Sequence, residues 1–97
     1  MAAGDWKDML NASQEGNLAL VKYHIKAGVN PNYQHPEFLT TPLIESAQFG
    51  HKEIVEFLLE NGADPTLKAG FSNDTALSVA KEYKQKEIIE LLKKYLK

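Results

Sequence analysis

The three histidines, His24, His35 and His51, are the side chains of this chain most suited to bind a metal ion. A zinc site requires ligands that converge at a recognisable spacing. These histidines instead fall in a predicted helix, a loop and the start of another helix. The chain has no cysteine, so thiolate ligands, disulfides and cysteine nucleophiles are excluded. We therefore predict neither a metal site nor a cofactor.

Pairs of carboxylates three residues apart could act as a general acid and a general base. Asp5 with Asp8 and Glu53 with Glu56 have this spacing. The same spacing is typical of a solvent-exposed helix face. The sequence contains no Gly-rich phosphate loop, nucleophile elbow or HExxH motif, and its serines have no evident base partner. We therefore predict no catalytic residue and no enzymatic activity. The enzyme alternative would require a deep pocket with a perturbed acid–base pair.

Lysines are concentrated near the C-terminus and could bind phosphate or an anionic surface. They are Lys81, Lys84, Lys86, Lys93, Lys94 and Lys97. Glutamates alternate with them, which is typical of a solvated outer face. The formal net charge is −2 and arginine is absent, whereas proteins that bind nucleic acid usually carry a basic excess. Binding of nucleic acid or an anionic surface through the last helix therefore stays as the weakest alternative.

The positions of these residues follow from a repeat of 34 residues. The run AGVNP at 27–31 returns as NGADP at 61–65, and TPL at 41–43 returns as TAL at 75–77. A fixed period of about 20–50 residues is typical of stacked-repeat proteins. The repeat divides a single domain, residues 1–97, into three units at about 5–35, 36–69 and 70–97.

The central unit predicts two helices joined by a tight turn. The first opens at Thr41-Pro42, a cap followed by a proline at the first helical position, and ends near Gly50. The second runs from about Lys52 to Asn61, and His51 is expected to help start it. Its apolar stripe is Ile54, Val55, Leu58 and Leu59. The last helix of the chain is expected at about 86–95.

One helix pair cannot bury its apolar face alone, so neighbouring units must stack to form the core. Ala12, Ser46 and Ala80 align as small residues that let the first helices approach closely. His24 aligns with Leu58 and Leu92 and is expected to be half-buried. In the last unit, Lys81 and Lys93 replace residues that are apolar or small in the other units, which predicts an end cap.

Together, TPL at 41–43, GHKEIVEFLL at 50–59 and NGADP at 61–65 resemble the ankyrin repeat. The resemblance implies an all-α solenoid of three helix–turn–helix repeats with hairpin-like loops. It also implies binding of other proteins through the loop tips and the concave face of the first helices, without catalysis. The sequence departs from the pattern at Leu39, Asn73 and Lys84, where glycine is usual, and at Ile44 and Ser78, where histidine is usual.

The ankyrin pattern assigns the partner-binding positions to the two residues before the inter-helix glycine and to the loop tips. In this sequence they are Gln14, Glu15, Glu37, Phe38, Thr40, Gln48, Phe49, Phe71, Asp74, Glu82 and Tyr83. With Trp6, the aromatic members form a row on one predicted surface, and exposed aromatic clusters mark interfaces. Phe38 and Phe71 are either exposed anchors or apolar plugs under the loops. Phe49 and Tyr83 are predicted anchors, and Trp6 is expected to cover the open end of the first unit.

The sequence therefore predicts a non-catalytic protein–protein interaction module that acts as an inhibitor or adaptor. No further domain is visible, so we expect a stand-alone monomer that masks a partner surface. The start of the chain does not resemble a signal peptide, and no apolar run is long enough to span a membrane, so we expect a cytoplasmic protein. The alternative is a structural protein that self-associates through an exposed solenoid end. The sequence does not identify the partner.

Overall fold

The computed structural model describes residues 5–70 and 72–96. In this part of the chain, all regular structure is helical. The helices are α1 (Asp5–Glu15), α2 (Leu18–Lys26), α3 (Pro42–Gln48), α4 (Lys52–Glu60), α5 (Ala76–Glu82) and α6 (Lys86–Tyr95). Helices α2, α4 and α6 begin at residues 18, 52 and 86, a constant interval of 34. The predicted all-α architecture of repeated helix pairs is confirmed.

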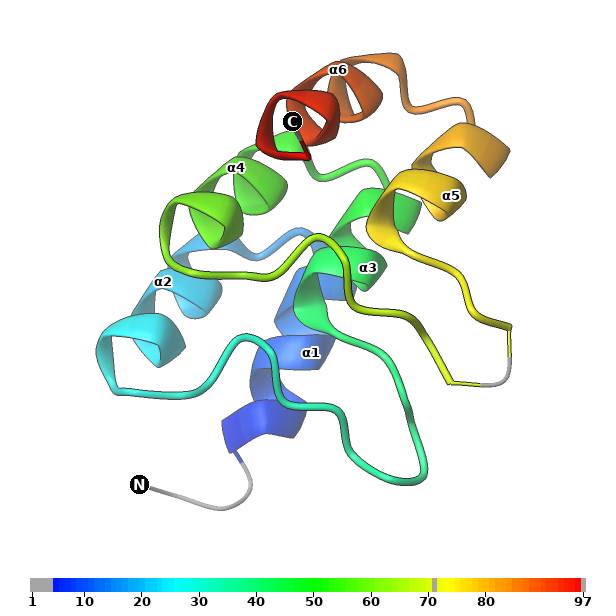
Figure 1. Cartoon of the computed structure of the whole chain (residues 1–97). Helices are drawn as coiled ribbons and strands as arrows, with labels where there is room; N and C mark the ends of the chain where they lie inside the picture. Colours follow the sequence, from blue (N-terminus) through cyan, green and yellow to red (C-terminus); the bar gives the residue numbers. More distant parts are fainter. Residues whose placement is uncertain (1–4, 71, 97) are drawn as a thin grey trace.

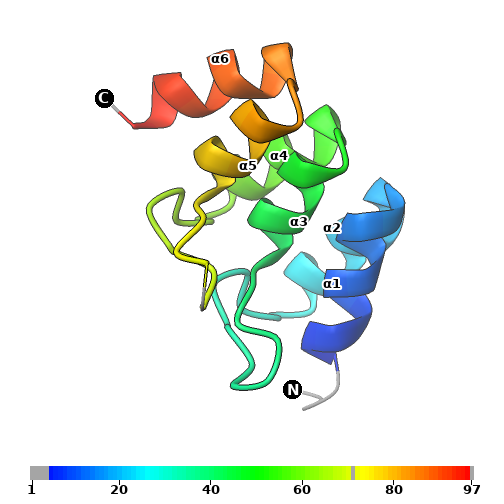
Figure 2. The same ribbon diagram turned by 90° about the vertical axis from the view of Figure 1, so that its right-hand side faces the viewer.

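The helices form two layers (Figures 1 and 2). In one layer α1 packs against α3 and α3 against α5; in the other, α2 contacts α4 and α4 contacts α6. The loops that join one helix pair to the next project together beyond one end of the layers (Figure 1). The molecule is a stack of three helical hairpins, with α1–α2 at one end and α5–α6 at the other.

The predicted threonine caps start the first helices of the second and third pairs. The Thr41 hydroxyl accepts a hydrogen bond from the Ile44 N–H at 3.2 Å, and Pro42 follows as the first helical residue. At α5, Thr75 and Ser78 bond reciprocally, each side chain accepting from the backbone N–H of the other. These caps satisfy amide groups that a helix start otherwise leaves unpaired.

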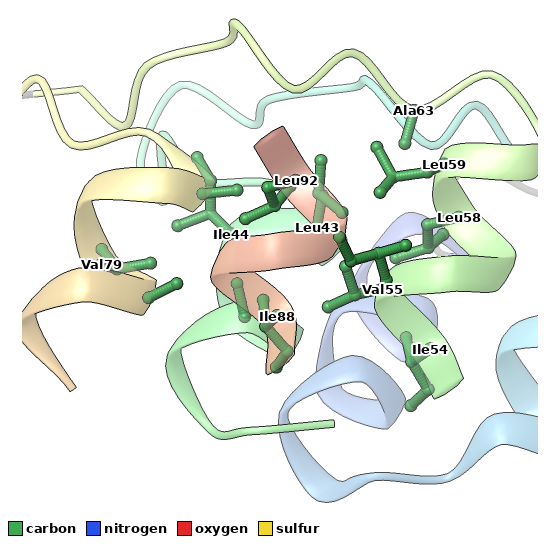
Figure 3. Close-up of a cluster of buried hydrophobic side chains, with 14 of the residues drawn as sticks. Leu43, Ile44, Ile54, Val55, Leu58, Leu59, Ala63, Val79, Ile88 and Leu92 are labelled. Atoms are coloured by element: carbon green, nitrogen blue, oxygen red, sulfur yellow. The ribbon is translucent and has the colours of Figure 1, made fainter. Parts of the chain in front are cut away.

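The core lies between the two layers (Figure 3). The predicted stripe of α4, formed by Ile54, Val55, Leu58 and Leu59, is buried against side chains of α3, α5 and α6. Ala12, Ser46 and Ala80 are buried where the first helices pack together, as predicted from their small size. The Ser46 hydroxyl donates to the Leu43 carbonyl at 3.1 Å, so its burial leaves no unpaired donor.

Three non-glycine residues have a left-handed backbone, and they are the three positions where the sequence lacks an expected glycine. The φ angles are 52° at Leu39, 58° at Asn73 and 57° at Lys84. The loops therefore keep the expected path despite the substitutions. At Leu39 the strain is offset by contact with the next loop. The Gly70 N–H donates to the Leu39 carbonyl at 2.8 Å, and a Cβ atom on Gly70 would overlap the Leu39 side chain.

The turn after α4 contains a carboxyl group, that of Asp64, whose pKa is shifted. The Thr66 hydroxyl, followed by the Thr66 N–H, holds the pKa of Asp64 below its ordinary value of 3.8. Asn32 ties this turn to the preceding loop, because its amide donates to the Gly62 carbonyl and accepts from the Asp64 N–H. A carboxyl whose pKa is lowered by folding stabilises the folded state above its unfolded pKa, and this contribution is lost as the pH falls through the folded pKa.

At the two ends of the stack, residues that align with core positions of the central pair differ in their burial. Lys81 and Lys93 are exposed, whereas Ala47 and Leu59 at the matching positions of the central pair are buried. This arrangement confirms the predicted polar end cap. At the other end, the expectation that His24 is only half-buried is wrong, since its exposed fraction is 4%. Neither ring nitrogen has a hydrogen-bond partner.

We predict that His24→Leu raises the free energy of unfolding by about 1 kcal/mol, because it removes a buried polar group without a partner. Leucine already fills the matching sites at Leu58 and Leu92. Urea denaturation measures the change, and Leu58→Ala, which should lower stability by about 2–5 kcal/mol, calibrates a core defect. A loss of stability in His24→Leu would show that the imidazole has a favourable partner.

We predict that Thr66→Val raises the pKa of Asp64 towards 3.8, because the variant removes the hydroxyl donor and keeps the backbone donor. The stability that Asp64 contributes above its unfolded pKa, and that is lost on acidification, should then be smaller, because its folded and unfolded pKa values move closer together. Titration of the Asp64 carboxyl carbon by NMR measures the pKa. An unchanged pKa would contradict the hydrogen bond as the main cause of the shift.

Candidate protein-binding surface

Phe49 and Tyr83 follow the last helical residues of α3 and α5 and occupy matching positions in neighbouring pairs. Their exposed fractions are 51% and 49%. The preceding residues, Gln48 and Glu82, are half-buried and exposed. The ends of the two first helices therefore each present an aromatic ring to solvent. Exposure agrees with the predicted role of these residues but does not by itself establish binding.

Neighbouring helix pairs are joined next to these rings by two equivalent hydrogen bonds, which we call the repeat staples. His51 Nε2 lies 2.8 Å from the Gln14 carbonyl oxygen, and Gln85 Nε2 donates to the Gln48 carbonyl at 3.1 Å. In each staple, the side chain at the start of a second helix reaches the end of the preceding first helix. Since a carbonyl only accepts, His51 carries its proton on Nε2 in this arrangement.

The staples explain an error in the sequence analysis. His51 was expected to help start α4, but its side chain makes no capping hydrogen bond. The same holds for Gln85 at α6. Asn17 occupies the matching position in the first pair, which has no preceding neighbour, and its side chain accepts from the Leu20 N–H at 3.1 Å. At this position, Asn17 caps its own helix in the first pair, whereas His51 and Gln85 join their helix pair to the preceding one.

The inter-helix glycine of the preceding pair leaves room for each staple side chain. Gly50 has a φ of +80°, and a Cβ atom there would lie 2.9 Å from Gln85 Oε1. At Gly16 the φ is +84°, and the Cβ would lie 2.7 Å from His51 Cε1. Gly62 differs, because its φ is +94° but no atom lies within 4 Å of the added Cβ. The inter-helix glycines are thus constrained twice, by backbone conformation and by the side chain that covers them.

Several predicted binding residues are held by side-chain hydrogen bonds, within one repeat for Thr40 and between repeats for Gln14 and Gln48. Gln14 Nε2 donates to Glu45 Oε1 at 2.8 Å, and Thr40 donates to Glu45 Oε2 at 2.8 Å. Gln48 Nε2 donates to the Tyr83 hydroxyl at 3.1 Å. The sequence analysis missed Glu45. It lies three residues before Gln48 and four before Phe49, so helical periodicity places it on the same face and could have identified it.

The first loop carries an aromatic cluster formed by Trp6, Tyr33, His35 and Phe38. Trp6 stacks on His35 with ring centroids 4.4 Å apart, and Phe38 meets Trp6 edge-on at 5.5 Å. Phe38 nevertheless keeps an exposed fraction of 44%, and Lys7 Nζ lies 5.6 Å from its ring centroid. Phe38 therefore packs partly against the aromatic cluster and is partly exposed to solvent. His35 was not predicted to be part of this cluster.

The remaining predicted positions differ in how far they are already engaged. Glu15, Glu37 and Glu82 are exposed. Asp74 is half-buried and accepts a hydrogen bond from the Ser78 hydroxyl at 2.9 Å, which helps hold the start of α5. Phe71 lies outside the described residues.

In residues 5–70 and 72–96, no group of three or more His, Cys, Asp or Glu side chains could hold a metal ion. A shallow hollow of about 250 Å³ lies beside the second staple and is lined mainly by Gly50, Lys52, Lys84, Gln85 and Lys86. One ion pair, between Lys52 Nζ and Glu87 Oε2 at 3.9 Å, borders this hollow. No helix in the described ranges has the length and apolar character that crossing a membrane requires.

Comparison with known proteins identifies a family. The family model for ankyrin repeats, in three copies, matches residues 9–97. No curated protein matches the chain. The family match includes both repeat staples and the aromatic positions at Phe49 and Tyr83.

We predict that Gly50→Ala lowers stability more than Gly62→Ala. Both variants place alanine at a positive φ, which costs about 1–2 kcal/mol, but only Gly50→Ala also displaces the Gln85 staple. The lost hydrogen bond should add about 0.5–1.5 kcal/mol. Chemical denaturation measures the difference.

Gln85→Ala provides the control for this prediction, since it removes the staple before the glycine is changed. In that background, Gly50→Ala should cost no more than Gly62→Ala does in the unmodified chain. An undiminished cost would show that the staple does not contribute to the requirement for glycine.

Proposed function

The chain belongs to the ankyrin repeat family, and we propose that it binds a partner protein across the ends of α1, α3 and α5 and the adjacent loop tips. Members of this family are generally protein–protein interaction modules and typically lack catalytic activity. We further propose that residues 1–97 act as a single domain with units at about 5–35, 36–69 and 70–97.

The observation that carries this proposal is the exposure of two aromatic rings at matching positions of neighbouring repeats. Phe49 and Tyr83 each expose about half of their surface. Large aromatic side chains of this kind dominate the binding energy of many protein interfaces. Gln48, which precedes Phe49, donates to the Tyr83 hydroxyl and accepts the second staple from Gln85, so little conformational entropy should be lost when a partner binds.

Polar residues surround the two rings and would form the rim of the interface. We propose this role for Gln14, Glu15, Glu37, Thr40, Gln48, Asp74 and Glu82. Phe38, and Phe71 in the next loop, would extend the surface to the loop tips. Rim groups of this kind exclude water and set orientation more than they set affinity.

A module of this type acts by occupying a surface of its partner, as an inhibitor or an adaptor. We propose a monomer in preference to a self-associating structural protein. Support comes from Lys81 and Lys93, whose exposed ammonium groups at the α5–α6 end would have to be buried if another unit stacked there.

We predict that Phe49→Ala and Tyr83→Ala each weaken partner binding by about thirtyfold, as expected for central aromatic anchors, and lower the free energy of unfolding by less than about 1 kcal/mol. Affinity capture with the intact chain, followed by titration of the captured protein, measures binding. Thermal denaturation measures stability.

Tyr95→Ala is the matched control, because Tyr95 is similarly exposed but ends α6 in the other helix layer. Its binding should equal that of the unmodified chain. If Phe49→Ala and Tyr83→Ala destabilise the fold as strongly as a core Leu→Ala, by about 2–5 kcal/mol, the two rings are structural and the proposal fails.

A further inference from the structure

We propose that the partner segment bound by this surface is a basic polyproline II helix that places an arginine or lysine on every third residue. The inference rests on the proposed function and specifies its ligand. Three features of the surface lead to it: the spacing of its matching positions, its unpaired carboxylates, and its polar rather than apolar floor.

The spacing follows from helix packing. Packed helices lie about 8–10 Å apart, and α1, α3 and α5 pack in a row (Figure 2). Glu15, Phe49 and Tyr83 occupy matching positions at the ends of these helices, and all three are exposed. We call these positions the three stations. The staples tie the ends of α1 and α3 to the starts of α4 and α6, and Gln48 donates to the Tyr83 hydroxyl, so the stations are held in place before a ligand binds.

A polyproline II helix advances about 3.1 Å per residue and repeats its face every three residues, so side chains at i and i+3 lie about 9 Å apart on one face. This distance matches the separation between stations. An extended strand presents the same face every second residue, about 7 Å apart, and falls out of register by the third station. An α-helix reaches a similar distance at i and i+7, about 10.5 Å.

The surface between the stations favours polyproline II over the α-helix. An amphipathic helix docks its apolar face into an apolar groove. Here the region beside the rings carries the hydrogen-bonded side chains of Gln14, Glu45 and Gln48. A polyproline II segment has a solvated backbone without internal hydrogen bonds, and it binds surfaces that combine aromatic rings with polar groups.

The charge of the surface favours a basic ligand. Glu15 is itself a station, and Glu45 and Glu82 lie close to the stations along α3 and α5; Glu37 and Asp74 lie in the loops that lead into these helices. Within the described ranges none of them forms an ion pair, and the two neutral donors on Glu45 leave its charge uncompensated. Lysines lie near the other parts of the surface: Lys7 over Phe38, Lys81 close to Tyr83 in sequence, and Lys52, Lys84 and Lys86 around the hollow at Gly50. The negative potential should therefore be strongest between Glu15 and Glu45.

Aromatic rings add to this preference, since a cation over a ring face is stabilised by the charge distribution of the ring. The molecule makes this contact twice with its own lysines, Lys7 over Phe38 and Lys22 over Phe57, each with Nζ 5.6 Å from the ring centroid. Phe49 and Tyr83 are exposed and would offer the same contact to a guanidinium group of the ligand.

Synthetic peptides of equal length test the inference by isothermal titration calorimetry. The first repeats Arg-Pro-Pro, the second has the same composition with its arginines clustered at one end, and the third repeats Glu-Pro-Pro. We expect the first to bind about tenfold more tightly than the second, a difference of about 1.4 kcal/mol, and the third not to bind. Equal binding of the first two peptides would overturn the spacing argument. Tighter binding of the third would overturn the charge argument.

A fourth peptide separates the two ligand conformations. It is an alanine-based helix with arginine at every seventh position, and tighter binding of this peptide than of Arg-Pro-Pro would overturn the assignment of polyproline II. For the Arg-Pro-Pro peptide, Phe49→Ala and Glu15→Gln should each weaken binding about fivefold or more, whereas Tyr95→Ala should not change it. Amide shifts in NMR spectra should change at the ends of α1, α3 and α5. Shifts confined to α6 would overturn the proposed location.

These results are distinguishable from a failure of the proposed function. If Phe49→Ala abolishes capture of the natural partner but no peptide binds, the binding surface is supported and the polyproline II inference is wrong. If the Arg-Pro-Pro peptide binds at the three stations but capture of the natural partner is unaffected by Phe49→Ala and Tyr83→Ala, the proposed function at this surface is wrong.

Discussion

The repeat staples are the interaction on which the arrangement of the surface depends. Hydrophobic burial holds each helix pair against the next, but it is non-directional and does not by itself fix register. The bonds from His51 to the Gln14 carbonyl and from Gln85 to the Gln48 carbonyl are directional. They join the residue that starts one second helix to the residue near the end of the preceding first helix. The positions next to them, Glu15, Phe49 and Tyr83, are therefore held at a repeating interval.

The loops are also joined by directional hydrogen bonds in addition to apolar packing. Asn32 bonds to both sides of the Gly62–Asp64 turn, and Gln34 Nε2 donates to the Lys68 carbonyl at 2.8 Å. Leu39 packs on Gly70 where the two loops meet. Polar side chains thus bond one repeat to the backbone of the next outside the apolar core. Neighbouring repeats are therefore held by directional bonds at the loops as well as by packing in the core.

Much of the fold could be predicted from the sequence because its signals are local. The period of 34 residues located the helix pairs, and Thr41-Pro42 marked a helix start. The staples could not be predicted in this way. Each joins residues 37 apart, and both His51 and Gln85 stand where a local reading assigns a helix cap.

The candidate site was predicted less completely than the fold, for the same reason. The exposure of Phe49 and Tyr83 follows from their position at helix ends, whereas the role of Glu45 depends on donors from α1 and from the preceding loop. The stacking of His35 on Trp6 joins the first loop to α1 and has no sequence signal. His24 is buried, with no hydrogen-bond partner among the described residues, because the stack places it where the other pairs have leucine. The polar character of its side chain would not predict this burial.

Hydrogen–deuterium exchange of the chain with and without its bound partner tests the central claim most directly. If the stapled ends of the first helices form the interface, protection should appear in residues 45–50 and 79–84 and in the adjacent loop tips. The exposed sides of α2, α4 and α6 should exchange as in the free chain. Protection confined to α4 and α6, or to the α5–α6 end of the stack, would contradict this account.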